Sequence, residues 1–145
     1  MTMRKKMMIV SALFLCLLSF ALSGCDKYVS SCRVMACVQT NTSSKASVSF
    51  SKLTGKMVYK LKTDTTKVIH YTGELNSGSI TVYYDTDGTK KEMFTIKAGE
   101  NVDATLGSLQ KGTTYVILET NEKSSNGSFC FEVESSGSAE SENDD

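Results

Sequence analysis

Residues 112–134 read GTTYVILETNEKSSNGSFCFEVE and hold the two clearest strand patterns of the chain. In the first pattern, residues 115–118 are apolar on both faces of an extended chain. In the second, Phe129 and Phe131 share one face and Cys130 takes the other. A period of two residues is typical of β-strands, because successive side chains point to opposite faces. The stretch therefore predicts two strands joined by a polar segment.

The same alternation recurs earlier in the chain, in short repeats separated by turn residues, most often glycine. These repeats cover residues 48–50, 57–61, 68–71, 80–84, 94–96 and 102–106. No window of 11 or more residues in this body favours a helix. About eight short strands at this spacing predict an all-β domain over residues 46–134, folded as an antiparallel sandwich or jelly roll.

The N-terminus has the pattern of an export signal. Basic residues 4–6 precede an apolar run over residues 7–22, which is shorter than a membrane-spanning helix requires. The motif Leu-Ser-Gly-Cys at residues 22–25 resembles the lipobox of bacterial lipoproteins. That resemblance implies removal of residues 1–24 and a thioether-linked diacylglycerol on Cys25, whose two acyl chains suffice for stable anchoring. A plain cleaved signal peptide and an uncleaved signal anchor are the alternatives.

Residues 25–45 are expected to form a lipidated tether. Residues 34–38 are apolar enough to add a short strand, and a Ser/Thr/Asn stretch follows them. Cys32, Cys37 and Cys130 are the cysteines left for chemistry in the mature chain. An oxidising exterior favours one disulfide among three pairings, and free thiols are the alternative. A bond from Cys130 to Cys32 or Cys37 would pin the tether across the last strand. A zinc site fits poorly, because no CxxC spacing is present.

The single histidine, His70, has no catalytic partner placed by a motif. None of the common hydrolase, metalloprotease or nucleotide-binding motifs occurs in the chain. A lone histidine in a strand is more often a structural or surface residue than a base. A cleft that holds His70 beside two carboxylates would instead indicate an enzyme. We therefore expect no catalytic residues and no enzymatic activity.

Asp85-Thr86-Asp87-Gly88 resembles the start of a calcium loop, with carboxylates at alternate positions. Lysines follow directly, however, and Glu92 comes too early to close a twelve-residue loop. An Asp-Gly pair between two strand patterns also predicts a hairpin turn. We expect the turn, with no required metal or cofactor, and keep Asp85 and Asp87 as weak candidates for calcium.

Several tyrosines could stack on sugar rings if they lie on an exposed sheet face. The alternative is that most of them are half-buried in the sheets with their hydroxyls outside. The candidates are Tyr59, Tyr71, Tyr83, Tyr84 and Tyr115.

Residues 92–134 resemble the bacterial pre-peptidase C-terminal domains. The resemblance rests on a glycine before a Thr-Thr-Tyr-Val-Ile strand, a turn at Asn126-Gly127 and a final Phe-x-Phe-x-Val strand. Many small lipoproteins of Gram-positive gut bacteria are similar. The resemblance implies a jelly-roll accessory module without catalytic residues.

The net charge is zero, with 16 basic and 16 acidic residues. It cancels between the basic signal segment and an acidic tail over residues 135–145, which is expected to be disordered. A neutral domain argues against nucleic-acid binding. The sequence thus predicts a lipid-anchored, extracytoplasmic, non-catalytic binding or structural module. Its partners would be the membrane and a protein or glycan at the cell surface. Carbohydrate or calcium binding is the alternative function.

Overall fold

The computed structural model describes residues 27–136, and all regular elements in that range are β-strands. The all-β antiparallel sandwich of about eight strands is confirmed. No helix within these residues has the length and apolarity to cross a membrane. The expected signal peptide, Cys25 and most of the acidic tail lie outside the described residues. The strands are β1 (Ser31–Met35), β2 (Val38–Asn41), β3 (Lys45–Thr63), β4 (Lys67–Ser77), β5 (Ser79–Asp85), β6 (Lys91–Lys97), β7 (Asn101–Leu106) and β8 (Gly112–Ser135).

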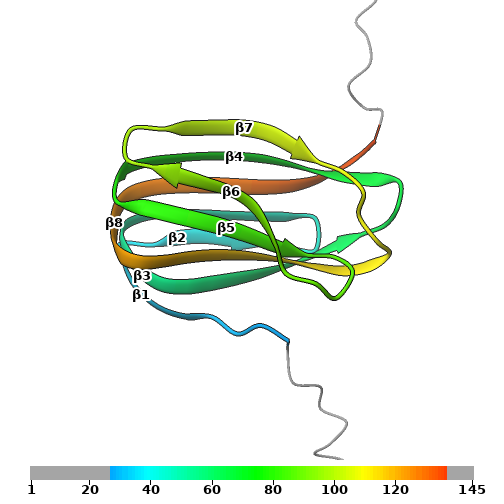
Figure 1. Ribbon diagram of the computed structural model, residues 1–145, viewed down its shortest axis with the longest axis horizontal. Coiled ribbons are helices and arrows are strands. Elements are labelled where there is room, and N and C mark those ends of the chain that lie inside the picture. The colour runs from blue at the N-terminus through cyan, green and yellow to red at the C-terminus, as the bar shows by residue number, and fades with distance from the viewer. Residues whose placement is uncertain (1–26, 137–145) are drawn as a thin grey trace, which may run out of the picture.

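Two long strands, β3 and β8, run through both layers of the sandwich (Figure 1). Residues 45–53 of β3 pair with residues 124–132 of β8, and residues 55–63 pair with residues 112–120. The first pairing lies in the back layer, whose strand order is β2-β3-β8-β4-β7. The second pairing lies in the front layer, whose strand order is β3-β8-β5-β6. The layers are therefore joined by continuous strands as well as by loops.

The expectation of separate strands at residues 48–50 and 57–61 is wrong, since both belong to β3. The turn expected at Gly55 is instead a β-bulge, where the register shifts between Leu53 and Gly55. Gly55 has a φ of 106°, a backbone conformation that favours glycine. The two patterns of residues 112–134 likewise form one strand, β8, and Asn126-Gly127 lies within it. A bend rather than a turn connects the layers in both cases.

The core lies between the two layers. Phe129 of the back layer stacks at 6.4 Å on Phe94 of β6, which stacks in turn at 5.0 Å on Tyr71 of β4. Each fully buried large apolar side chain contributes about 1.5–3 kcal/mol to the free energy of unfolding. The largest fully buried side chains are Phe129, Phe131, Leu53, Leu61, Ile69, Leu75, Ile80, Ile96, Leu109, Ile117, Leu118 and Val48.

The described part of the expected tether contributes to the sandwich. β1 pairs with β3 at the bend, Cys32 lying opposite Gly55, and β2 pairs with the start of β3. Before β1, the segment 27–30, here called the N-terminal strap, reaches the front layer. The Tyr28 ring packs edge-on against Tyr115 at 5.1 Å. The chain is thus packed against the domain from residue 27 onward.

Candidate functional site

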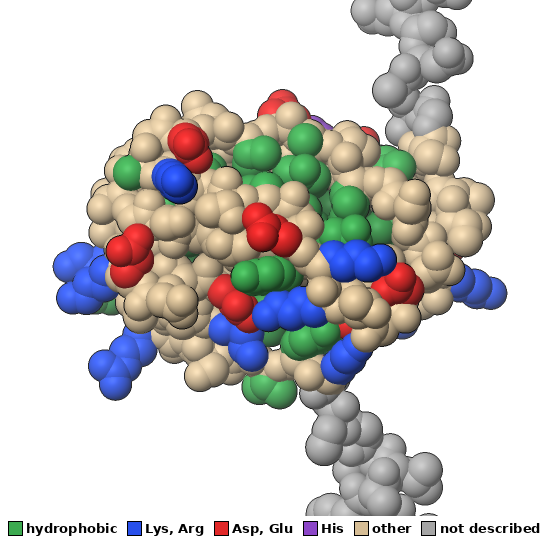
Figure 2. Space-filling model, viewed as in Figure 1, with side chains coloured by type: hydrophobic (Ala, Val, Ile, Leu, Met, Phe, Trp, Pro, Cys, Tyr) green, Lys and Arg blue, Asp and Glu red, His purple; other side chains and the backbone are tan. Residues whose placement is uncertain are grey.

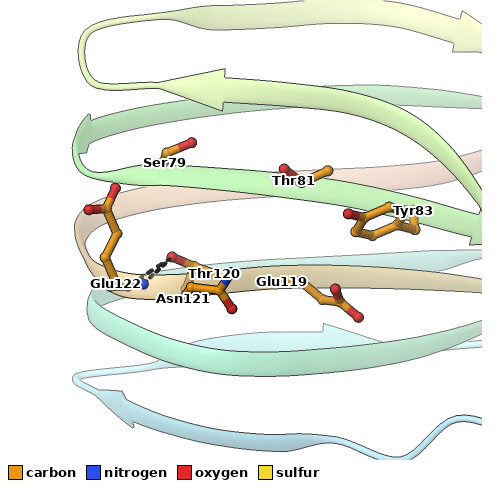
Figure 3. A pocket seen from close by; sticks show the side chains of 7 residues that line it. All are labelled: Ser79, Thr81, Tyr83, Glu119, Thr120, Asn121 and Glu122. Carbon is orange, nitrogen blue, oxygen red and sulfur yellow. Dashed lines mark hydrogen bonds between the residues drawn. The ribbon is translucent and has the colours of Figure 1, made fainter.

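A groove between β5 and β8 opens on the outer face of the front layer (Figure 3). It encloses about 280 Å³. Tyr83 supplies the aromatic surface, Glu119 and Glu122 supply carboxylates, and Asn121 supplies an amide. The lining residues are Ser79, Thr81, Tyr83, Glu119, Thr120, Asn121 and Glu122. We refer to this feature as the β5–β8 groove.

Strand alternation places these side chains outward. On β5, Ile80 and Val82 are fully buried, so the residues of opposite parity face solvent. The register then sets Thr81 directly opposite Glu119, and Tyr83 opposite Ile117. Ile117 is fully buried although it belongs to the outer face. Tyr83 therefore has a buried apolar residue as its cross-strand neighbour, and the polar groups of the groove lie along the same face.

A lysine from the β5–β6 turn closes one side of the groove. The Lys90 ammonium lies 4.2 Å from the centroid of the Tyr83 ring and 2.6 Å from Oε1 of Glu119. One face of the aromatic ring is therefore covered by a cation that a nearby carboxylate holds in place. A ligand that stacks on this face must displace the ammonium or contact it.

The end of the groove at the β8 bend is held by hydroxyl groups. Thr120 Oγ1 donates to the backbone oxygen of Glu122 at 2.8 Å and lies 3.3 Å from Ser124 Oγ. Ser124 Oγ donates to the backbone oxygen of Ser79 at 3.3 Å, which ties β8 to β5. Both hydroxyl residues are buried, whereas Asn121 and Glu122 are exposed. The bend thus presents an amide and a carboxylate from a fixed backbone.

Asp85, one calcium candidate, lies at the far end of β5 and is held by the strap. Its Oδ2 accepts from Lys27 Nζ and from the Tyr28 hydroxyl, both at 2.7 Å, and its Oδ1 accepts from the Gly88 amide at 2.7 Å. Burial opposes ionisation, but these hydrogen bonds hold the pKa of Asp85 below its usual value. The carboxylate, 3% exposed, is therefore neutralised by a lysine of its own chain.

Asp87, the second calcium candidate, pairs with Lys91 at 3.1 Å. The hydrogen bond from Lys91 lowers the pKa of Asp87. The expected hairpin turn is present, because β5 ends at Asp85 and β6 begins at Lys91. Among residues 27–136, no group of three histidine, cysteine, aspartate or glutamate side chains is placed to hold a metal ion.

His70 lies beside two carboxylates on the outer face of the back layer. Its Nε2 is 2.7 Å from Asp103 Oδ1, and its Nδ1 is 3.7 Å from Glu134 Oε1. The hydrogen bond with Asp103 raises the pKa of His70. Its side chain is 37% exposed, and the neighbouring cavity of about 370 Å³ is lined by Asp103 but not by His70. The histidine belongs to an exposed ion-pair cluster.

The three cysteines of the described chain are free thiols in the structure. Cys32 and Cys37 pack against the core near Tyr59. Burial, and then the nearby Cys37, raise the pKa of Cys32. Cys130 lies in β8 between Ser47 of β3 and Thr72 of β4. It shares its parity with outward residues, because Phe129 and Phe131 are buried.

Of the five tyrosine candidates, the groove uses Tyr83. Tyr59 is 3% exposed and donates its hydroxyl to Gln39 Oε1 at 3.0 Å, and Tyr71 stacks on Phe94 in the core. Tyr84 is half-buried, and Tyr115 lies under the strap. The sequence alone does not identify the hydroxyl, amide and carboxylate residues that line the groove beside Tyr83. The outward parity of Ser79, Thr81 and Tyr83 is the pattern from which the β5 side could be found.

Comparison with known proteins finds similarity to solved structures at low sequence identity. No protein-family model matches it, and no curated protein matches it. A family 29 carbohydrate-binding module is similar in structure, with a TM-score of 0.40 and 15% identity over 79% of this chain and 83% of that one. A cupin protein from Bacteroides fragilis has a TM-score of 0.38 and 15% identity over 82% and 90% of the two chains. TmCBM61, solved with β-1,4-galactotriose, has a TM-score of 0.35 and 13% identity over 69% and 70%.

Proposed function

We propose that this protein is a non-catalytic binding module, held at the outer side of a bacterial membrane by a lipid on Cys25, whose β5–β8 groove binds carbohydrate. The observation that carries the ligand class is the makeup of the groove. Tyr83 offers an aromatic surface, and hydroxyl, amide and carboxylate groups surround it within one face of a rigid sheet. The lipobox pattern at residues 22–25 carries the anchor.

Sugars combine an apolar ring face with many hydroxyl groups. Such a ligand needs an aromatic surface for the ring, together with donors and acceptors for its hydroxyls. Glu119 and Glu122 are acceptors, Asn121 is both donor and acceptor, and the hydroxyls of β5 are both as well. A volume of about 280 Å³ lies near the lower end of the range for small-molecule sites. The groove therefore suits a short stretch of a glycan.

Lys90 defines how the ligand enters. Its ammonium covers the Tyr83 ring in the free protein, so a sugar ring stacks there by taking its place. The displaced ammonium can stay paired with Glu119 or donate to a sugar hydroxyl. Because a cation–π contact at an exposed site contributes only about 0.5–1 kcal/mol, the exchange has a small cost.

The test is a glycan array followed by calorimetric titration of the purified protein. We expect binding of a neutral glycan, and a loss of affinity of about 30-fold or more in Tyr83→Ala and in Glu119→Gln, since hot-spot contacts cost about 2 kcal/mol or more. Glu132→Gln makes the same change on β8 in the back layer and serves as the control. A folded protein that binds no glycan, or equal losses in control and groove variants, contradicts the proposal.

Calcium binding is tested in the same instrument. A calcium titration that gives no heat, in the protein and in Asp85→Asn, agrees with carbohydrate as the ligand. Saturable calcium binding that Asp85→Asn or Asp87→Asn abolishes would favour the calcium module instead.

The anchor is tested by the intact mass of protein extracted from the membrane fraction. We expect a mature chain that begins at Cys25 and carries a diacylglycerol, and a soluble, unlipidated product from Cys25→Ser. A mature mass without lipid refutes the anchor but leaves the glycan proposal standing.

A further inference from the structure

One edge of the sandwich carries the exposed large apolar side chains of the described residues. Val29 is 65% exposed, Val34 36%, Met35 59% and Val38 75%. All four fall within ten consecutive positions of the strap, β1 and β2. Clusters of exposed apolar residues mark interaction surfaces far more often than isolated ones do. β1 and β2 pair only with β3 in the described chain, so their other side is an open strand edge.

Cations flank this edge. A shallow cavity of about 440 Å³ at the bend is lined by Val34 and Met35 together with Arg33, Lys52 and Lys123. One carboxylate, Glu122, also lines it. Figure 2 shows Lys and Arg side chains projecting at this end of the molecule. Apolar side chains among cations match the headgroup region of an anionic bilayer, which attracts lysine and arginine and admits apolar groups at its boundary.

The same edge is close to the proposed lipid. Cys25 is two residues before Lys27, and an extended chain spans at most about 3.6 Å per residue. Lys27 is fixed on Asp85 at 2.7 Å, and Tyr28 on Tyr115. A lipid on Cys25 therefore enters the bilayer within about 7 Å of a packed residue. No long spacer separates the sandwich from the membrane.

We propose that the edge formed by the strap, β1 and β2 lies on the membrane, in contact with anionic lipid headgroups. The inference rests on the proposed lipid anchor. In Figure 1 the strap and β1 run along the lower margin, and β7 forms the upper one. The β5–β8 groove then opens sideways, parallel to the bilayer, where a surface glycan can reach it.

A second copy of the chain is the competing occupant of an open edge. Edge-to-edge pairing of two copies would bring two sets of these cations together, since each copy has Arg33, Lys52 and Lys123 against the single carboxylate of Glu122 around this cavity. Lysine and other charges on edge strands are a known means of preventing such pairing. An anionic bilayer is the partner whose charge complements this edge.

The chain contains no tryptophan, so a single introduced tryptophan reports its own environment. We would reconstitute lipidated Val38→Trp and Met35→Trp proteins in vesicles of equal parts phosphatidylcholine and phosphatidylglycerol with brominated acyl chains. Thr105→Trp on β7, at the opposite edge and also exposed, is the matched control. We expect blue-shifted emission and bromine quenching at positions 35 and 38, and neither at position 105.

The contribution of the cations to membrane docking is measured by the same tryptophan quenching. Replacing Arg33 and Lys52 together by glutamine is expected to weaken docking about 25-fold, since each cation near an anionic surface contributes about fivefold. Quenching at position 38 should therefore fall in that variant and at high salt.

Two outcomes overturn the inference while the anchor stands. One is equal quenching at positions 38 and 105 in protein whose mass shows the lipid. The other is a blue shift at position 38 without quenching, together with a doubled mass in light scattering, which would identify a second copy as the occupant. A mass without lipid removes the anchor and this inference together, whereas glycan titration is unaffected.

Discussion

The bend at Gly55 gives the sharpest test of how the sandwich holds its edge. Gly55 has a φ of 106°, and a Cβ there would collide with the backbone oxygen of Ser31 and lie 2.9 Å from Cys32 Cα. Gly88 has nearly the same φ, 101°, but a Cβ there would have no atom within 4 Å. Alanine at Gly88 therefore measures backbone strain alone, whereas alanine at Gly55 measures strain and collision together.

The expected losses of folding stability follow from the backbone strain and from the collision. Left-handed backbone costs an L-residue about 1–2 kcal/mol, which is the expected loss for Gly88→Ala. Gly55→Ala adds a collision with backbone, comparable to overpacking at about 1–3 kcal/mol. β1 can relieve the collision by leaving β3, because Cys32 is its only half-buried side chain. The expected global loss is therefore about 2–3 kcal/mol rather than the full sum.

Urea denaturation followed by far-ultraviolet circular dichroism measures the global term, and hydrogen exchange of the β1 amides measures the local one. We expect Gly55→Ala to unfold at lower urea than Gly88→Ala and to lose protection across Ser31–Met35. Equal midpoints for the two variants, or β1 amides as protected as in the wild type, would refute the account of the bend. Vesicle docking should weaken with Gly55→Ala, because its edge strand is then displaced.

Three further predictions concern the contacts around the sandwich. Tyr28→Phe removes a donor from the buried Asp85 carboxylate and should cost about 1.5 kcal/mol in urea denaturation, as for a hydrogen bond to a charged group; no change would mean that the strap is not held by this bond. Phe129→Ala should cost about 3–5 kcal/mol, since its fully buried ring stacks across the layers, and a loss below 1 kcal/mol would contradict the packing. The raised pKa of His70 means that its bond to Asp103 stabilises the fold fully below pH 6.5, the ordinary pKa, and that this stability is lost as pH rises through the folded pKa. His70→Gln should flatten that part of the stability profile, and an unchanged profile would assign the pH dependence elsewhere.

The strands from β4 to β7 and the turn at Asp87-Gly88 could be predicted because their signals are local. Each shows two-residue alternation bounded by turn residues. The continuity of β8 could not be predicted in the same way. Residues 121–123 are exposed polar residues at the bend, so their composition resembles that of a loop. Only the pairing of the residues on either side, Thr120 with Gly55 and Ser124 with Leu53 of β3, shows that the strand continues through the bend.

The groove depends on register in the same way. The outward parity of Ser79, Thr81 and Tyr83 can be predicted from the buried residues between them. Their partners cannot, because Glu119 faces Thr81 only through the pairing of β5 with β8. Lys90 reaches Tyr83 from the turn beyond β5, which no pattern within β5 indicates. The β5 side of the groove can therefore be predicted from the sequence, whereas the β8 side depends on how the two strands pair.

Asp85 shows why a short motif is a weak guide to binding chemistry. Its own neighbours favour a turn and also allow the start of a calcium loop. The residue that decides is Lys27, whose ammonium lies 2.7 Å away although it is 58 positions distant in the sequence. A nearly buried carboxylate is stable only when a cation is paired with it, and a cation that the fold already holds close will form that pair. The fold holds Lys27 close to Asp85 because the next residue, Tyr28, packs on Tyr115. Asp85 thus fastens the strap to the front layer, and this contact would keep the proposed lipid close to the edge that we propose lies on the membrane.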